Sequence, residues 1–399
     1  MSVRKPSPAT NAPAAMSSRD RMLAALTFRP SDYTPCCFMA WSALRARSSD
    51  SIDFLDRQLA LGLDPLVRIP EIDVRMHPAV TTREWLSDAP PGEPYPVLHK
   101  EYATPAGKLL TSVNKSAEWP HGVHVPLWDD FLISHSRKFL VTPDDNLEAL
   151  KYVLGRPTDA DVDAFRRNAA SLKTLASDRK LLTMAAYVMM GDMANWLAGL
   201  QPLMMATIDS PAFVRSLLDI IEEWNKPFID LSLEAGADLV VRRGWYENAD
   251  FWSPPMFRQF LLPSLARQAD RVHRAGAKFG YLVSCSSMPL LDMMMEAGVD
   301  VLLGIDPAQD AMMDYPELKR KTAGKMALWG GVCGYLTMEC GSPDDIRRQT
   351  RQAMRELAPG GGFILSPVTN IRDASDKAFA NAQTLIDTWL ELRTAPASL

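Results

Sequence analysis

The sequence predicts an α/β fold, an eight-stranded parallel β/α barrel of the TIM type. Short apolar runs alternate with segments of helix length, which is the pattern that parallel strands joined by crossover helices require. Eight such runs begin near residues 36, 65, 181, 237, 277, 299, 326 and 361. No Gly-rich phosphate-binding turn follows any run, which disfavours the rival open, doubly wound sheet. We therefore expect a closed barrel with an N-terminal extension and an inserted β-rich lid.

The N-terminal part is expected to form the extension, two strands and the lid. Residues 1–16 are rich in Pro, Ala and Ser and lack an apolar core, so they are predicted to form a disordered tail. Residues 17–399 are predicted to be a single barrel domain. About residues 76–139, Pro and Gly clusters and alternating stretches indicate β-hairpins that form a lid over the barrel mouth. The other expected elements are a helix at 17–26 capped by Ser17 or Ser18, a strand at 36–41, a helix at 51–61 and a strand at 65–70.

The remaining part has a more regular pattern. Each apolar run there is β-rich and ends in small, polar or thiol residues. The helix expected at 342–357 begins Ser-Pro-Asp-Asp, which places Pro in the first turn. The expected strands are 180–188, 237–244, 277–285, 299–307, 326–332 and 361–367, and the other expected helices are 144–152, 159–177 and 375–394.

Composition indicates an ordinary soluble protein. The 399 residues are 47% hydrophobic and 23% charged, with a net charge of −5, which argues against a nucleic-acid or anionic-membrane partner. No stretch approaches the roughly 18 uninterrupted apolar residues of a transmembrane helix. Five cysteines without a secretory signal suggest reduced thiols, and neither CxxC nor HExxH is present. We predict a cytoplasmic protein.

Parallel barrels place their chemistry at the carboxyl ends of the strands, which directs attention to acids and thiols there. Glu247 and Asp250 follow the fourth strand and are candidates for a general acid or a metal ligand, although Asp250 is equally suited to cap a helix. Cys285 ends the fifth strand and is a candidate nucleophile, with a small buried apolar role as the alternative. Cys285 and Cys333, together with Glu247 and a lid histidine, form a candidate zinc site.

Other side chains are candidates for binding substrate. An arginine at a strand end can hold a carboxylate, and because neighbours alternate faces only one of Arg242 and Arg243 can point into the barrel. The methionine-rich stretch after the third strand suggests an apolar pocket for an aromatic or macrocyclic ligand, although most methionines are expected in the core. The predicted substrate-binding residues are Arg68, Met189, Asp192, Asn195, Arg242, Tyr246, Asp306 and Ser366, with His124 from the lid.

The chain resembles the uroporphyrinogen decarboxylase superfamily over about residues 17–394. The motifs are Ser18-Arg-Asp-Arg-Met-Leu-Ala-Ala-Leu-Thr-Phe-Arg-Pro-Ser-Asp-Tyr-Thr-Pro35, Trp252-Ser-Pro-Pro-Met-Phe-Arg-Gln-Phe-Leu-Leu-Pro263, Val272-His-Arg-Ala-Gly276, Trp329-Gly-Gly-Val332 and Gly361-Gly-Phe-Ile-Leu-Ser-Pro367. Their order and spacing carry the resemblance. It implies the barrel fold and a site at the mouth, but not one reaction.

The departures from the superfamily are equally informative. Its zinc-dependent methyltransferases use His-x-Cys after the fifth strand and a further Cys after the eighth, where this chain has Val283-Ser-Cys285 and Ser366-Pro-Val-Thr369. Its decarboxylases carry a His after the last strand, which Val368-Thr-Asn370 lacks, and an Arg-rich loop that Trp41-Ser-Ala-Leu-Arg45 only loosely resembles. Neither subgroup is matched at its catalytic positions.

The resemblance implies three alternative functions. The first is a methyltransferase. It would move a methyl group between an acceptor and either a small substrate, including a methoxylated aromatic, or a corrinoid protein. The stretch Thr104-Pro-Ala-Gly-Lys108 with Trp119 is more similar to the methyltransferase members than to the decarboxylases. The second is a decarboxylase or lyase acting on a carboxylated aromatic or a tetrapyrrole such as uroporphyrinogen. The third is a barrel that binds a corrinoid or a partner protein without catalysis. A corrinoid on a partner protein, or zinc, is the cofactor to consider, and a homodimer is the expected assembly.

Overall fold

A single parallel sheet curls to form the barrel. The structure, a computed structural model, describes residues 15–185, 188–368 and 370–394. Within them the strands follow the order β1-β6-β8-β9-β10-β11-β12, with β7 also paired to β8, and all neighbours are parallel. The bounds are β1 Leu66–Arg68, β6 Leu182–Met184, β7 Val188–Met189, β8 Leu239–Arg243, β9 Lys278–Leu282, β10 Val301–Ile305, β11 Ala327–Cys333 and β12 Phe363–Val368.

The segment 36–40 lies between the two edge strands β12 and β1; it is bridged to the β12 side and joined to the residues before β1 by one hydrogen bond. Cys36 and Ala40 form parallel bridges with Leu365 and Asn370, and the Asp64 amide donates to the Cys36 carbonyl at 2.8 Å. The predicted barrel is thereby confirmed, although the strand expected at 36–41 is reduced to isolated bridges. The strand expected at 180–188 is β6 and β7, and its residues 186–187 lie outside the described residues, as do residues 1–14 of the predicted tail.

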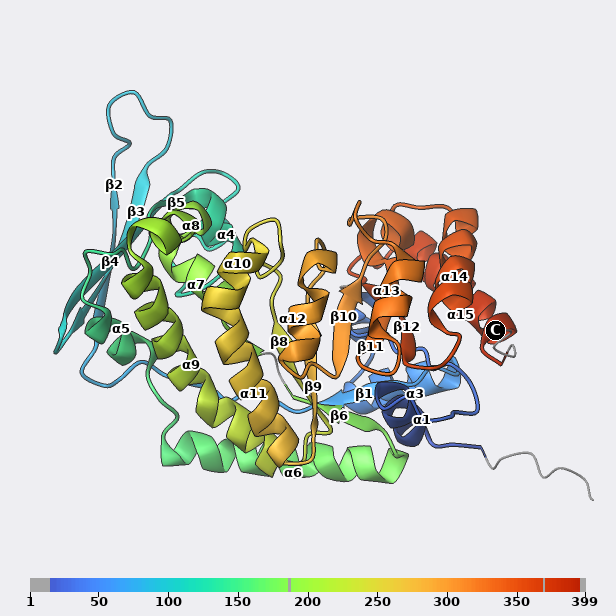
Figure 1. Cartoon of the computed structure of the whole chain (residues 1–399). Helices are drawn as coiled ribbons and strands as arrows, with labels where there is room; N and C mark the ends of the chain where they lie inside the picture. The colour runs from blue at the N-terminus through green and yellow to red at the C-terminus, as the bar shows by residue number, and fades with distance from the viewer. Residues whose placement is uncertain (1–14, 186–187, 369, 395–399) are drawn as a thin grey trace, which may run out of the picture.

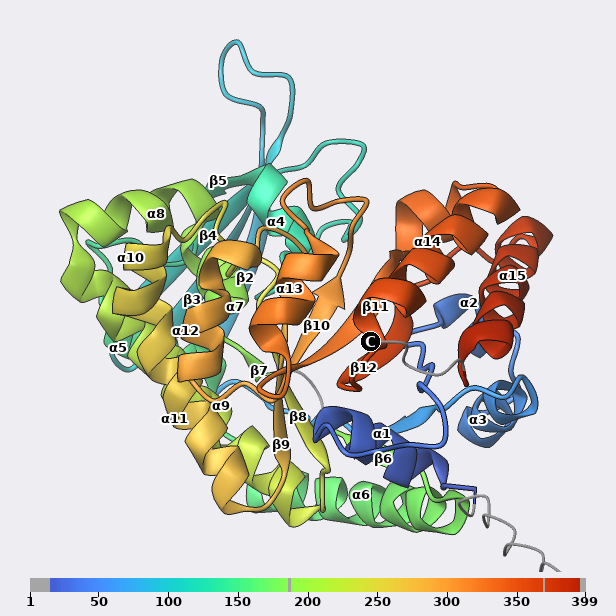
Figure 2. The same cartoon turned by 45° about the vertical axis from the view of Figure 1, so that its right-hand side comes forward.

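Helices cover the outside of the barrel (Figures 1 and 2). Two of the long helices begin at a residue whose side chain caps the helix. Thr158 and Ser342 each form a capping box with the Asp three residues later. The outer helices are α3 Ser51–Ala60, α6 Asp159–Arg179, α9 Pro211–Glu234, α11 Leu262–Arg274, α12 Leu291–Glu296, α13 Tyr315–Thr322, α14 Pro343–Leu357 and α15 Asp376–Leu392. Shorter ones are α2 Ser42–Ala46, α5 Leu147–Leu154, α7 Gly191–Ala198, α8 Leu200–Asp209 and α10 Pro254–Met256. No helix in the described ranges is long and apolar enough to cross a membrane.

The inside of the barrel is filled with apolar side chains. Alternate residues of each strand point inward, and they form one buried cluster with residues of helix α1 (Ser18–Leu26). Its strand members include Leu182, Met184, Leu239, Val241, Leu282, Val301, Leu303, Ala327, Trp329 and Ile364. Because this interior is packed, the ends of the barrel are left for chemistry.

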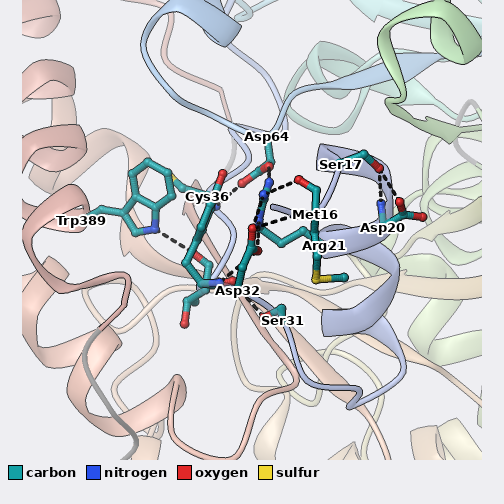
Figure 3. Close-up of polar contacts among 11 residues, drawn as sticks. Met16, Ser17, Asp20, Arg21, Ser31, Asp32, Cys36, Asp64 and Trp389 are labelled. Atoms are coloured by element: carbon teal, nitrogen blue, oxygen red, sulfur yellow. Dashed lines mark hydrogen bonds and ion pairs between the residues drawn. The ribbon is translucent and has the colours of Figure 1, made fainter. Parts of the chain in front are cut away.

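Helix α1 closes the amino-terminal end of the barrel, and Arg21 ties it in place (Figure 3). The Arg21 guanidinium donates to Asp64 at 2.5 Å and to both carboxylate oxygens of Asp32 at 2.7 and 2.8 Å, and it stacks on the Tyr33 ring. Burial raises the pKa of Asp64, and Arg21 counteracts that shift. This buried ion-pair network joins the extension to the loops below the first two strands.

The insertion between β1 and β6 carries its own antiparallel sheet, in the order β2 Thr81–Ser87, β3 Val97–Thr104, β4 Gly107–Asn114 and β5 Ser136–Lys138. A small separate core of Leu98, Val113, Trp119, Val125 and Leu132 holds it together with helix α4 (Asp130–His135). Figure 1 shows this sheet near α7 and α8, at the end of the molecule away from α1. The β-rich insertion is therefore confirmed, and α4 brings it to the barrel mouth.

Candidate active site

Strand β8 presents its two arginines to opposite sides. Leu239 and Val241 belong to the barrel interior, so Arg243, two residues further on, points into the mouth, whereas Arg242 points outward. The Arg243 Nε lies 3.2 Å from Asp192 Oδ2, and its guanidinium lies 4.3 Å from the ring centroid of Trp245. A substrate at the mouth would therefore meet Arg243, and not Arg242 as the sequence analysis expected.

Asp192 is the acid that faces Arg243. It lies in the first turn of α7, is fully buried, and accepts a hydrogen bond from the Tyr246 amide on Oδ1 at 2.8 Å. Its Oδ2 has no hydrogen-bond donor in the described structure, since Arg243 approaches as an ion pair without hydrogen-bond alignment. Burial raises the pKa of Asp192 to about 7 against the lowering effect of Arg243, and the nearby Glu247 raises it further. Such a carboxyl can hold or release a proton near neutral pH.

Asn195 follows Asp192 by three residues, which places both side chains on one face of α7. Its side chain is fully buried, and neither its Oδ1 nor its Nδ2 has a hydrogen-bond partner among the described residues. Buried amides are almost always paired in folded proteins, so an orphaned one needs an explanation. A polar group of a bound molecule would supply one.

The insertion contacts this site through Asp130, at the start of α4. One carboxylate oxygen accepts from Trp196 Nε1 at 3.0 Å and from the Tyr246 hydroxyl at 3.1 Å. The other lies 3.5 Å from Arg243. Tyr246, predicted to bind substrate, is thus placed between the insertion and the mouth.

Glu247 and Arg242 form a pair behind the strand. Both are fully buried, and Arg242 donates from Nε to Glu247 Oε2 at 2.8 Å and from Nη1 to Ser264 on α11 at 2.9 Å. Glu247 also accepts from the Tyr281 hydroxyl and the Gly191 amide. All these contacts join strands β8 and β9 to helices α7 and α11. The structure therefore places Glu247 in a closed network and corrects the expectation that Arg242 lines the mouth.

The two candidate zinc thiols lie at the ends of β9 and β11 without the further ligands that zinc needs. Asn248 donates to Cys285 Sγ at 3.3 Å, and Gln309 donates to Cys333 Sγ at 3.4 Å. Burial raises the pKa of both thiols. Over the described ranges, no group of three or more His, Cys, Asp or Glu side chains is placed to hold a metal. The predicted zinc site is therefore not assembled, because Glu247 is held by Arg242.

The remaining candidates lie in several different places. Asp250 accepts from the Ser286 hydroxyl at 2.6 Å, and Asp306 accepts the amides of the loop that follows it. Ser366 bonds within the closure of the barrel, donating to the Pro367 carbonyl. His124 lies in the insertion and pairs at 3.0 Å with Glu84. Met189 lines a cleft of about 400 Å³. Arg68 and Arg45 both line another cleft, of about 330 Å³.

Sequence reasoning missed Asp130, Trp196 and Trp245 and did not choose Arg243. Strand β8 is apolar on both faces, so its pattern does not tell the inner face from the outer one. The contact with Asp130 joins residues far apart in the chain, and nothing in the local sequence indicates it.

Comparison with known proteins identifies the family. Residues 182–388, more than half of the chain, match the family Uroporphyrinogen decarboxylase (URO-D). The chain belongs to the uroporphyrinogen decarboxylase family, which confirms the resemblance found in the sequence.

The individual relatives include two enzyme classes. A methylcobamide:CoM methyltransferase, MtaA, from Methanosarcina barkeri is 25% identical over 186 residues, covering 45% of this chain and 52% of that protein. A uroporphyrinogen decarboxylase from Hydrogenovibrio crunogenus is 24% identical over 207 residues, covering 50% and 54%. The chain thus spans about half the length of the curated relatives it matches. A solved methyltransferase from Methanosarcina mazei superposes with a TM-score of 0.59 at 18% identity, over 94% of this chain and 98% of the other, which shows the shared fold.

Proposed function

We propose that the protein is a methyltransferase that removes a methyl group from the oxygen of a small methoxylated substrate, with Asp192 as the proton donor. The observation that carries this proposal is the buried Asp192 carboxyl, whose pKa is about 7 and whose Oδ2 lacks a hydrogen-bond donor among the described residues. A methoxy oxygen is a poor leaving group unless it gains a proton as the carbon–oxygen bond breaks.

The chemistry at this site balances with one acceptor and one acid. The lone pair of the acceptor forms a bond to the methyl carbon, the carbon–oxygen bond breaks, and its electron pair stays on the oxygen. That oxygen takes the proton from Asp192. The carboxylate that remains is stabilised by Arg243 at 3.2 Å and by the Tyr246 amide at 2.8 Å.

The side chains around Asp192 suit an aromatic substrate. Arg243 stacks over Trp245 and Trp196, with 4.3 and 5.0 Å between the guanidinium and the ring centroids. These rings offer flat apolar contact, while the unpartnered amide of Asn195 offers both a donor and an acceptor. A reduced corrinoid on a separate protein, or a thiolate, would supply the nucleophile; the described residues provide no zinc site to activate one.

The proposal is tested by methyl transfer under anaerobic conditions. Purified protein is mixed with a panel of methoxylated benzoates and with free cob(I)alamin as the probe acceptor, and the loss of the cob(I)alamin absorbance is followed. Asp192→Asn is expected to lower the rate by about 10²–10⁴-fold, the usual contribution of a positioned general acid. Asp178→Asn, an exposed position on α6 at the other end of the molecule, is the matched control and should leave the rate unchanged. An equal rate for Asp192→Asn and the wild type would contradict the proposal.

A decarboxylase acting on a carboxylated aromatic or a tetrapyrrole is the second candidate. It is supported by the cleft of about 330 Å³ that Arg45 and Arg68 line together with Phe38, Trp41 and Phe54, because guanidinium groups bind carboxylates. In that reaction carbon dioxide leaves, its bonding electrons stay on the substrate carbon, and that carbon takes a proton from water, because Asp192 does not line this cleft. Release of carbon dioxide from uroporphyrinogen, without methyl transfer to cob(I)alamin, would select this function.

A further inference from the structure

A second cleft lies on the outer side of the barrel. It encloses about 400 Å³ between helix α9, the segment 70–74 that follows β1, and the outward-facing Val188 and Val240 of β7 and β8. That volume is within the range of pockets that bind small molecules. Neither the proposed methyl transfer nor the second candidate uses it.

Aromatic rings form one part of the cleft wall. Trp224 and Phe228, one turn apart on α9, have ring centroids 4.5 Å apart, and Trp128 from the insertion lies 5.6 Å from Trp224. The Trp224 Nε1 donates to the Leu154 carbonyl at 3.0 Å, which fixes the orientation of this ring. The three rings, tilted by 55–58° to their neighbours, pack against one another and all line the cleft.

Hydrogen-bond acceptors and negative charges form another part. Glu71 and Asp73 line the cleft, and neither forms an ion pair with a described residue. Asn225, only 2% exposed, donates from Nδ2 to the carbonyls of Met189 and Ile221 at 2.8 and 2.9 Å. Its amide orientation is thereby fixed, and Oδ1 remains as an acceptor without a partner in the described structure. Among the described residues, no lysine, arginine or histidine lines this cleft.

We propose that this cleft binds a small alkylammonium ion, N-methylated forms included. The π faces of Trp and Phe attract cations, and the methyl groups of a quaternary ammonium ion can also pack against the rings. Glu71 and Asp73 supply two negative charges, and Asn225 Oδ1 would accept a hydrogen bond from any N–H group. A neutral or anionic ligand would gain none of these charge interactions.

One residue of the cleft also contacts the arginine of the barrel mouth. Met189 lines the cleft, and the Met189 sulfur lies 3.8 Å from Arg243 Nη1. A bound cation would therefore lie one side chain away from the Asp192–Arg243 pair. Binding at the cleft does not depend on methyl transfer, so each proposal can fail without the other.

The test compares choline with its neutral isostere, 3,3-dimethylbutan-1-ol, on the full chain. Calorimetry gives the affinity, and the tryptophan fluorescence of the whole protein, to which Trp128 and Trp224 contribute, is followed in parallel, with sodium chloride at equal ionic strength as the blank. Choline is expected to bind saturably, and the isostere about tenfold or more weakly, because it has the same shape without the charge.

Matched variants locate the site. Glu71→Gln with Asp73→Asn should weaken choline binding by about tenfold, as expected when two exposed charges beside the ligand are removed. Asp88→Asn with Glu118→Gln, two exposed acids of the insertion without ion pairs to described residues, is the control and should leave binding unchanged. Phe228→Leu should also weaken binding. Equal affinity for choline and its isostere, absence of saturable choline binding, or equal losses in both double variants would overturn the proposal.

Discussion

Replacing Asp192 by asparagine should change how the stability of the protein depends on pH. Asp192 has a pKa of about 7 in the folded protein, and the ordinary value is 3.8. The folded state therefore holds its proton more tightly than the unfolded chain does. Its contribution to stability is complete below about pH 4 and is lost as the pH rises through about 7. A difference of about three pKa units corresponds to about 4 kcal/mol at 1.36 kcal/mol per unit.

The assay is urea unfolding of the wild type and Asp192→Asn at a series of pH values between 4 and 8. Asparagine resembles the protonated acid and does not titrate, so the wild-type free energy of unfolding minus that of the variant isolates Asp192. We predict that this difference falls by about 4 kcal/mol across the series. Asp345→Asn is the control, because Ser342 and Arg348 lower the pKa of Asp345 instead of raising it. Asp345 is therefore ionised in both the folded and the unfolded chain above pH 4. The difference in unfolding free energy between the wild type and this variant should be flat over that range. A flat or rising difference for Asp192 would refute the reasoning.

Three further predictions follow from the same contacts. Arg243→Gln removes the charge that lowers the pKa of Asp192, so the loss of methyl-transfer rate at alkaline pH should move to higher pH; a move to lower pH would show that Arg243 does not act on Asp192. Glu247→Ala leaves Arg242 buried without its partner and should lower the free energy of unfolding in urea by about 3–5 kcal/mol, and a loss below about 1 kcal/mol would contradict the buried pair. Arg21→Met leaves the buried Asp64 carboxylate without its ion-pair partner. It should lower the free energy of unfolding in urea by about 3–5 kcal/mol and leave the pH profile of methyl transfer unchanged.

Much of the fold can be predicted from the sequence because it depends on local patterns. The apolar runs at 237–244, 277–285 and 299–307 contain β8, β9 and β10, and the run at 361–367 contains all of β12 except Val368. The helix expected at 342–357 is α14, which begins one residue later at Pro343 after its Ser342 cap. Where strand pairing depends on distant partners the prediction is weaker, as for 36–41, which makes two isolated bridges to other described residues.

The candidate site was only partly predictable. Asp192 and Asn195 were found because polar residues stand out in a methionine-rich stretch, and the structure places both on one buried face of α7. The choice between Arg242 and Arg243 required knowing which face of β8 points inward, and a strand buried on both faces does not reveal it. Glu247 stood out as an acid after a strand, but its three buried partners come from elements 5 to 56 residues away.

The most direct test of the account compares Asp192 with Cys285 in one experiment. Methyl transfer from a methoxylated benzoate to cob(I)alamin is measured for the wild type, Asp192→Asn and Cys285→Ser, each treated with a chelator and assayed for bound zinc. We predict that the wild type and Cys285→Ser transfer the methyl group without zinc, whereas Asp192→Asn is slower by about 10²–10⁴-fold. Transfer that requires zinc and is lost in Cys285→Ser, but persists in Asp192→Asn, would contradict the account.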